Sequence, residues 1–134
     1  MTYNSDQTIE LLQRAVAEKG DGYVYPGADG YDTFSCRYAD YLTGAPSCLI
    51  GHVLDYLGLL SEAAEGHSAN RMEVVHNQFT PGSALVLRAA QILQDKGHAW
   101  GEALIAAKET ADAKDQRRFL RDLENKFFGR KEES

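Results

Sequence analysis

The sequence contains no apolar run that approaches the roughly 18 residues needed to cross a membrane. Its first residues have neither the basic start nor the apolar block of a signal peptide, so we expect a cytoplasmic protein without a membrane partner. It also has no Gly-rich phosphate loop, no HExxH motif and no GxSxG motif. The usual sequence signatures of nucleotide binding, metalloprotease chemistry and serine-hydrolase chemistry are therefore missing.

Cysteine is scarce, and the paired C-x2-C knuckle of most structural zinc sites is absent. The two cysteines are Cys36 and Cys48. In a reducing cytoplasm we expect both thiols to be reduced rather than joined.

Positive charge is lacking over most of the chain. Residues 1–113 hold 15 acidic and 7 basic side chains, and the whole chain has a net charge of −6. An acidic body disfavours nucleic-acid binding, because neutralisation of phosphates supplies most of that affinity. Residues 114–131 are the exception, with four more basic than acidic residues. This segment could contact an acidic partner, nucleic-acid phosphates or the body of its own chain, or it could be an ordinary solvated helix face.

The 134 residues suit one domain, and the apolar fraction of 43% is that of a globular protein. Hydrophobic periodicity and end signals predict four helices. The first covers 6–19, with Asn4 or Ser5 as its cap and Gly20 as its stop, and the second covers 46–58. The third is capped by Thr80, has Pro81 at its first helical position and ends before Gly97, and it is apolar nearly all round, as expected of a central helix.

The fourth helix begins near Ala99 and either continues to Phe127 or breaks near Thr110. The short link between the third and fourth helices predicts that they pack antiparallel. Residues 110–134 are expected to form a charged helical extension with a short disordered tail.

Between the first two helices, aromatic and β-branched residues are bounded by Gly, Asp and Pro. This pattern predicts two short strands, at 23–25 and 33–38, with a turn at 26–30. The predicted fold is therefore α+β and mainly helical, with about four helices and a small antiparallel β-hairpin in a single domain spanning 1–134.

Within segment 46–58, Cys48, His52 and Asp55 share one face of the predicted helix, opposite the apolar face. A zinc site is one interpretation, with Cys36, Cys48 and His52 as ligands. A fourth ligand would come from His67, His76 or His98. The alternative is a pair of small buried thiols beside an exposed imidazole, with no cofactor.

Cys48 is also placed to begin a helix, where unpaired backbone N–H groups stabilise a thiolate. Segment 48–58, CLIGHVLDYLG, together with segment 97–102, GHAWGE, resembles transglutaminase-like cysteine enzymes, which have a helix-start cysteine and a later His-x-Trp. The resemblance implies Cys48 as nucleophile and His98 as base, with Asp112 or Asp115 as the orienting acid. In that family the histidine opens a strand, whereas His98 here is followed by strong helix formers: Glu102, Ala103, Leu104, Ala106, Ala107 and Lys108.

A wider resemblance rests on the order of several segments. They are FSCRY at 34–38, PSCLIGHVL at 46–54 and AAQILQDKGHAWGEA at 89–103. Over residues 5–109 this order resembles small uncharacterised proteins of actinobacterial bacteriophages. The resemblance implies a role inside an infected bacterium and supplies no activity or site residues.

These observations predict a non-enzymatic, phage-type accessory protein that acts through protein–protein contacts in the host cytoplasm. Tyrosine is enriched at interfaces, and the Gly-rich segment holds five candidate partner-binding tyrosines: Tyr23, Tyr25, Tyr31, Tyr38 and Tyr41. They could equally cover the hairpin. The alternative function is a cysteine-dependent enzyme or zinc protein built on Cys48 with His52 or His98. The sequence is also compatible with a homo-oligomer of this chain.

Overall fold

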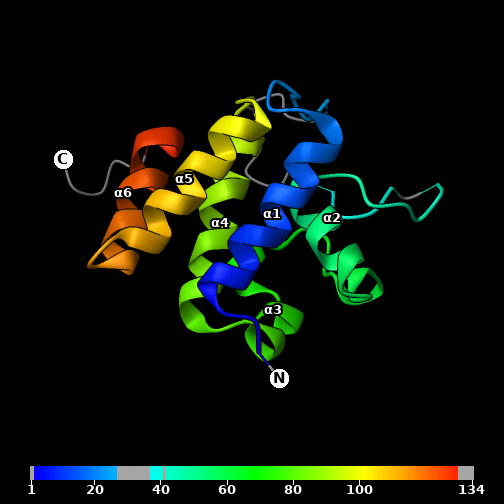
Figure 1. The fold of residues 1–134 in the computed structure, drawn as a ribbon, viewed down its shortest axis with the longest axis horizontal. Coiled ribbons are helices and arrows are strands. Elements are labelled where there is room, and N and C mark those ends of the chain that lie inside the picture. The colour runs from blue at the N-terminus through cyan, green and yellow to red at the C-terminus, as the bar shows by residue number, and fades with distance from the viewer. Residues whose placement is uncertain (1, 27–36, 41, 130–134) are drawn as a thin grey trace.

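The computed structural model describes residues 2–26, 37–40 and 42–129. Over these residues the chain forms six α-helices and two short 3-10 helices (Figure 1). The elements are α1 (Ser5–Lys19), α2 (Leu49–Tyr56), η1 (Leu60–Glu62), η2 (Ala69–Arg71), α3 (Glu73–Gln78), α4 (Pro81–Asp95), α5 (Trp100–Asp112) and α6 (Gln116–Phe128).

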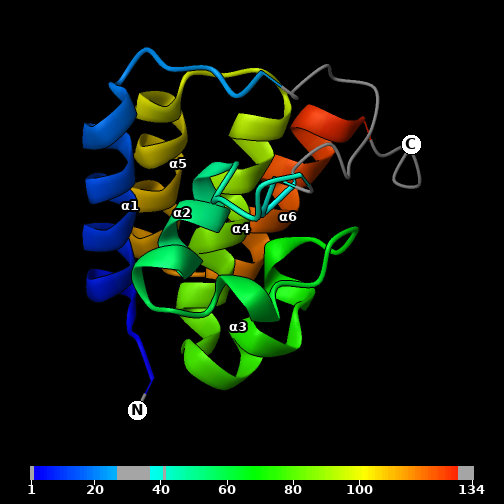
Figure 2. The ribbon, with the colours of Figure 1, turned by 90° about the vertical axis from the view of Figure 1, so that its right-hand side faces the viewer.

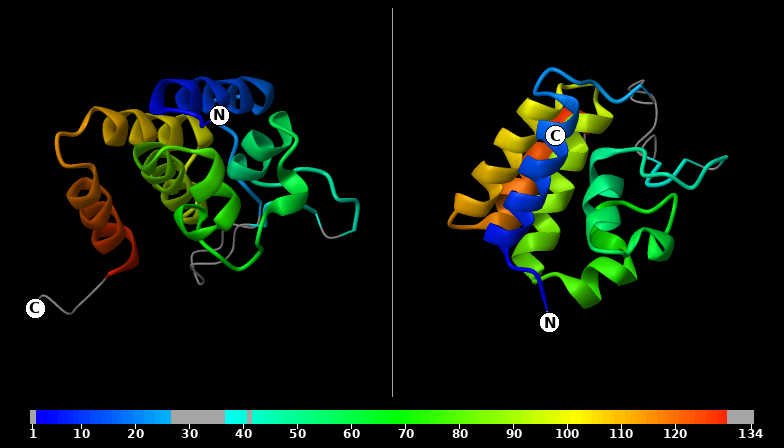
Figure 3. Two further views of the ribbon diagram at one scale, coloured as in Figure 1. Left: turned by 90° about the horizontal axis from the view of Figure 1, so that it is seen from below. Right: turned by 45° about the vertical axis from the view of Figure 1, so that its right-hand side comes forward.

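Helix α4 runs through the middle of the fold, and the other elements pack around it. Figure 2 shows α1 and α5 on one side of α4, with α2 and α3 on another. The view from below in Figure 3 shows α6 on the side of α4 away from α2. Every residue of α4 from 86 to 95 is buried. The predicted central helix is confirmed, and α5 returns antiparallel along it.

The predicted helix ends are confirmed where a capping side chain marks them. At the start of α1 the backbone N–H of Gln7 donates to the Asn4 side chain, and the N–H of Asn4 donates to the Gln7 side chain, both at 2.9 Å. This reciprocal capping box satisfies two N–H groups that have no partner within the helix. Thr80 caps α4 through the N–H of Ser83 at 3.2 Å.

The fourth predicted helix is two helices in the structure. The chain leaves α5 after Asp112, and Asp115 starts α6 by accepting the N–H of Arg118 at 3.1 Å. Leu120 on α6 is buried, and Leu123 and Phe127 pack partly buried against the core. The break lets α6 turn back onto α4 and α5, so it is part of the packed domain rather than an extension from it.

The predicted β-hairpin is wrong, and the fold is all-α rather than α+β. No strand occurs among the described residues, and residues 23–25 have no regular structure. Most of the second predicted strand, 33–38, and the turn from residue 27 lie outside the described residues. Two isolated bridges are the β-type pairs found in the described part, and they join Tyr3 to Phe79 and Ala39 to Pro46.

The backbone of the Tyr-rich segment is bonded to helix ends and side chains instead of to a second strand. The carbonyl of Tyr23 accepts the N–H of Trp100 at 2.8 Å, at the start of α5. The N–H of Tyr38 donates to a carboxylate oxygen of Glu65 at 3.0 Å. Residues with high strand propensity are those that fit an extended, half-buried backbone. Irregular extended chain provides the same environment, so these residues occur here without forming a strand.

Gly51 on α2 allows the chain around Tyr38 to lie against the helix. A Cβ at Gly51 would sit 2.0 Å from the carbonyl oxygen of Tyr38, which real Cβ atoms do not approach. The same oxygen accepts the N–H of Ser47 at 2.9 Å, so it is not free to move aside without losing that bond. The absence of a side chain at Gly51 therefore permits this close approach.

We expect Gly51→Ala to lower the free energy of unfolding by about 2 kcal/mol, because the clash outweighs the better helix propensity of alanine. Urea unfolding followed by circular dichroism measures it. Gly22→Ala is the matched control, since a Cβ at Gly22 meets nothing within 4 Å. A Gly51→Ala protein as stable as the parent would contradict the close packing described here.

Candidate functional site

The structure separates the members of the Cys48, His52 and Asp55 stripe by burial. Cys48 has an exposed fraction of 0% and His52 of 8%, whereas Asp55 is exposed. His52 Nδ1 donates to the carbonyl oxygen of Cys48 at 3.0 Å, and its ring meets Trp100 edge to face with centroids 5.5 Å apart. The imidazole is a packing group of the core, with its Nδ1 already used.

Cys48 is disulfide-bonded, so the expectation of reduced thiols does not hold for it. Cys36 is the only other cysteine of the chain, and it lies outside the described residues. A sulfur that is buried and oxidised is not a nucleophile, because the reactive species is an accessible thiolate.

The base and the orienting acids of the proposed catalytic triad have separate surroundings. His98 lies just before α5, with Nδ1 3.1 Å from Glu102 Oε1 and its ring against Phe127 at 5.2 Å. Asp112 is the last residue of that helix, which at 1.5 Å per residue puts it about 18 Å along the axis from Trp100, the first residue of α5. Asp115 caps α6.

The alternative zinc ligands also have separate surroundings. Across residues 2–26, 37–40 and 42–129, no group of three or more His, Cys, Asp or Glu side chains is placed to hold a metal ion. Cys36 lies outside this range. His67 is exposed, and Nε2 of His76 donates to the backbone carbonyl of Asn70 at 2.8 Å.

Three of the five candidate partner-binding tyrosines fall within the described residues. Tyr38 has an exposed fraction of 0%, and Tyr25 of 6%. Tyr23 is half-buried, with its ring edge to face against Trp100 at 4.7 Å. Tyr31 and Tyr41 lie outside the described residues.

Polar residues in the middle and C-terminal part of α4 are buried, although the sequence pattern predicts an almost wholly apolar helix there. We call them the α4 polar ladder: Arg88, Gln91, Gln94 and Asp95, with exposed fractions between 0% and 5%. A buried polar group must be hydrogen-bonded, or its lost contact with water destabilises the fold.

Gln94 caps the start of α2 from a different helix. Its Oε1 accepts the backbone N–H of Leu49 at 2.7 Å, one of the N–H groups that a helix start leaves without a helical partner. Cys48, at the N-cap position, provides no side-chain hydrogen bond. The Nε2 group of Gln94 donates to Asp95 Oδ1 at 2.9 Å.

Gln91 joins two irregular segments to α4. Its Oε1 accepts the N–H of Ala69 at 2.8 Å and Arg88 Nη1 at 3.0 Å. Its Nε2 donates to the Tyr38 hydroxyl at 2.7 Å, and that hydroxyl donates to the carbonyl of His67 at 2.5 Å. Burial raises the pKa of the Tyr38 hydroxyl above its usual range, so it stays protonated and keeps donating.

Arg88 connects the ladder to α6. Its Nε donates to Glu124 Oε2 at 3.2 Å, and its guanidinium lies 5.5 Å from the centre of the Phe128 ring. The spacing of residues 88, 91 and 95 in the sequence does indicate the α4 polar ladder. Steps of three and four residues place these polar side chains on one face of a helix that is otherwise mostly apolar. On a helix with no solvent face, such a polar stripe has to be buried and paired.

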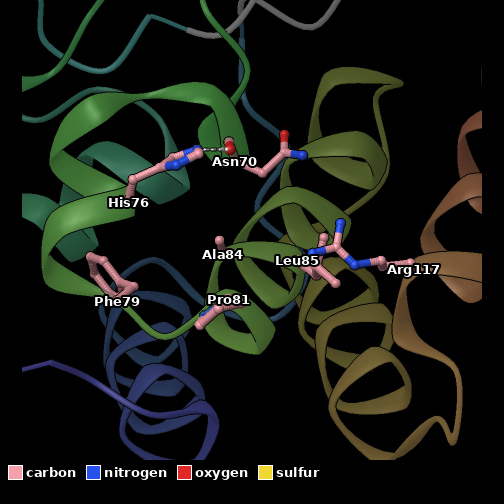
Figure 4. A pocket seen from close by; sticks show the side chains of 7 residues that line it. All are labelled: Asn70, His76, Phe79, Pro81, Ala84, Leu85 and Arg117. Atoms are coloured by element: carbon pink, nitrogen blue, oxygen red, sulfur yellow. Dashed lines mark hydrogen bonds between the residues drawn. The ribbon is translucent and has the colours of Figure 1, made fainter.

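A pocket of about 240 Å³ lies near the N-terminal end of α4. Ala84 lines this pocket and lies one helical turn before Arg88, on the same face of α4. We call it the Arg117 pocket, and its lining residues are Asn70, His76, Phe79, Pro81, Ala84, Leu85 and Arg117. Figure 4 shows Phe79 and His76 on one side of it, with Arg117 and Leu85 on the other. It is bounded by α3, η2, α4 and α6.

Arg117 also belongs to a basic surface, which we call the α6 basic face. It consists of four exposed cations: Lys114, Arg117, Arg118 and Arg121. In the part of the chain that the structure describes, none of these four side chains forms an ion pair. Exposed cations that form no ion pair are available to a charged partner.

Comparison of the chain with protein-family models, with curated proteins and with solved structures gave no match. The described part of the chain contains no helix that is both long and apolar enough to span a membrane. The observations define an all-helical domain with a buried polar helix at its centre and a basic, pocketed surface on one side.

We expect Gln91→Leu to lower the free energy of unfolding by about 3 kcal/mol. It leaves the Ala69 N–H and Arg88 without this acceptor, and each buried unpaired group costs about 1–3 kcal/mol. Gln13→Leu makes the same change at an exposed site on α1 and should alter stability by less than about 0.5 kcal/mol. Equal stability of the two variants in urea would show that the ladder is not needed.

We expect Cys48 to resist alkylation by iodoacetamide in the folded, non-reduced protein and to be modified after denaturation and reduction. Its burial and its disulfide both block the thiolate. Peptide mass spectrometry measures the modified fraction. Rapid labelling of native, unreduced Cys48 would contradict this prediction and would support a role of this residue as a nucleophile.

Proposed function

We propose that this chain is a non-enzymatic accessory protein of phage type that acts by binding another protein in the host cytoplasm. The α6 basic face supports this proposal most directly. It gathers four exposed cations on α6 and just before it, in a chain whose net charge is −6. Such charge segregation steers association with an acidic surface and favours it over other partners.

The chemistry-bearing residues support binding over catalysis. Cys48 and His52 are buried, and both are held in structural contacts. The α6 basic face, by contrast, presents three arginines and a lysine to solvent, and these are recognition groups rather than nucleophiles or metal ligands. Arginine pairs with carboxylates through two parallel hydrogen bonds, so it recognises acidic partners with defined geometry.

The cytoplasmic location is part of the proposal, and it requires the disulfide of Cys48 to persist in a reducing compartment. Disulfides are rare in reducing compartments. Trapping of thiols with acid and alkylating agent in expressing cells decides the matter. The disulfide in the structure predicts that Cys48 is recovered oxidised from the cytoplasmic fraction of these cells. Recovery of oxidised Cys48 only from an oxidising compartment would refute the proposed location.

The binding proposal predicts that a triple charge reversal, Arg117→Glu, Arg118→Glu and Arg121→Glu, abolishes capture of a partner from host lysate. The expected retention on the parent protein falls with salt, because exposed charges are screened over about 10 Å at 0.1 M ionic strength. Affinity purification followed by quantitative mass spectrometry provides the readout.

Lys108→Glu serves as the control for this experiment, since it reverses one exposed charge on α5. Nuclease treatment of the lysate excludes capture through nucleic acid. No enriched protein on the parent, or the same protein retained at full level by the triple variant, would refute the proposal. Loss of the partner after nuclease treatment would point to nucleic acid instead.

A further inference from the structure

We infer that the Arg117 pocket is the anchoring point of the partner. It takes an acidic protein segment that places one apolar side chain in the pocket and its carboxylates on the α6 basic face. This inference rests on the proposed function and specifies its site and the chemistry of the bound segment.

The volume and lining of the pocket fit one side chain. Sites for cofactors and drug-sized ligands have volumes of about 300–1,000 Å³, and this pocket has about 240 Å³. Its apolar part is made by Phe79, Pro81, Ala84 and Leu85. A buried aliphatic or aromatic side chain there would remove apolar surface of both partners from water, which is how anchor residues of interfaces contribute.

The charge beside the pocket selects acidic neighbours for that side chain. Arg117 lines the pocket and is exposed, and Figure 4 shows it reaching over Leu85. On α6, Arg121 lies one turn after Arg117, with Arg118 beside them. An extended acidic segment leaving the pocket along α6 would therefore meet arginines in succession.

An acidic protein segment fits these features better than a nucleic acid does. The four apolar side chains of the pocket offer no hydrogen bond to a phosphate or sugar, and half or more of protein–DNA hydrogen bonds go to those groups. The remaining surface of the chain is acidic, and phosphates would be repelled by it. An acidic protein segment carries less charge per length than a nucleic acid does, and one of its apolar side chains can pack against the apolar lining of the pocket.

The walls of the pocket are held in place before any partner arrives. The hydrogen bond from His76 to the carbonyl of Asn70 joins α3 to η2, at 2.8 Å. Gln91 holds η2 to α4 through the N–H of Ala69. Arg88 holds α6 to the same helix through Glu124. A preformed site loses less conformational entropy when it binds.

Selection of binders from a random dodecapeptide library displayed on yeast tests the inference with the full-length protein. The enriched peptides should contain an apolar residue flanked by acidic ones. The most enriched peptide is then made with a fluorescent label, and its dissociation constant is measured by anisotropy. We expect Arg117→Glu to weaken binding at least tenfold and Leu85→Ala at least threefold, while Lys108→Glu leaves it within twofold.

Arg117 is exposed, so Arg117→Glu should remain folded, and circular dichroism checks both variants. Amide chemical-shift changes should centre on the lining residues of the pocket. Enrichment without acidic residues, no enrichment, or full affinity in Arg117→Glu would overturn the inference. So would equal binding of a fluorescent mixed-sequence DNA duplex, or self-association through the pocket in sedimentation velocity.

The outcome separates this inference from the function on which it rests. If capture from lysate depends on the α6 arginines but selected peptides do not need Leu85 or Arg117, protein binding stands and the pocket assignment fails. If neither experiment yields a binder that depends on α6, both proposals fail.

Discussion

The hydrogen bonds that buried side-chain amides of α4 make to irregular backbone are the constraint on which the rest of the fold depends. Helices satisfy their own backbone groups, but the segments around Tyr38, Leu49 and Ala69 cannot do so. Gln91 and Gln94 accept the N–H groups of Ala69 and Leu49 inside the core. Without these acceptors, the segments could not be buried against an apolar helix at tolerable free energy.

The same helix places the surface to which we assign function. The polar ladder occupies the middle and end of one face of α4, and the Arg117 pocket occupies its start. The contacts of Gln91 fix η2, and those of Arg88 fix α6, so the two sides of the pocket are set by the core. Binding at this pocket would thus use a site that folding has already organised rather than one formed by the partner.

The local features of the sequence that proved reliable were helix ends and helical periodicity. Asn4, Thr80 and Pro81 mark helix starts through backbone chemistry that depends only on neighbouring residues. The hairpin was wrong because extended aromatic segments are strands only if a second strand supplies their hydrogen bonds. Here Glu65 and the start of α5 supply them, and neither is adjacent in sequence.

The candidate site was less predictable than the fold for the same reason. The sequence drew attention to Cys48 and His52, whose residue types suggest chemistry, but burial decides whether such groups act. The basic composition of residues 114–131 is visible in the sequence, whereas the separate helix α6, which lines a pocket with α3 and α4, depends on tertiary packing. The polar stripe at residues 88, 91 and 95 was readable in principle, because a central helix has no exposed face.

Native-state hydrogen exchange at the amides of Leu49 and Ala69 tests the central role of α4 most directly. If the glutamines hold these amides in the core, both should exchange with opening free energies within about 1 kcal/mol of global unfolding. The amide of Leu42, bonded to an exposed carboxylate of Asp40, provides the fast-exchanging reference. Exchange of Leu49 and Ala69 as fast as that of Leu42 would contradict the account.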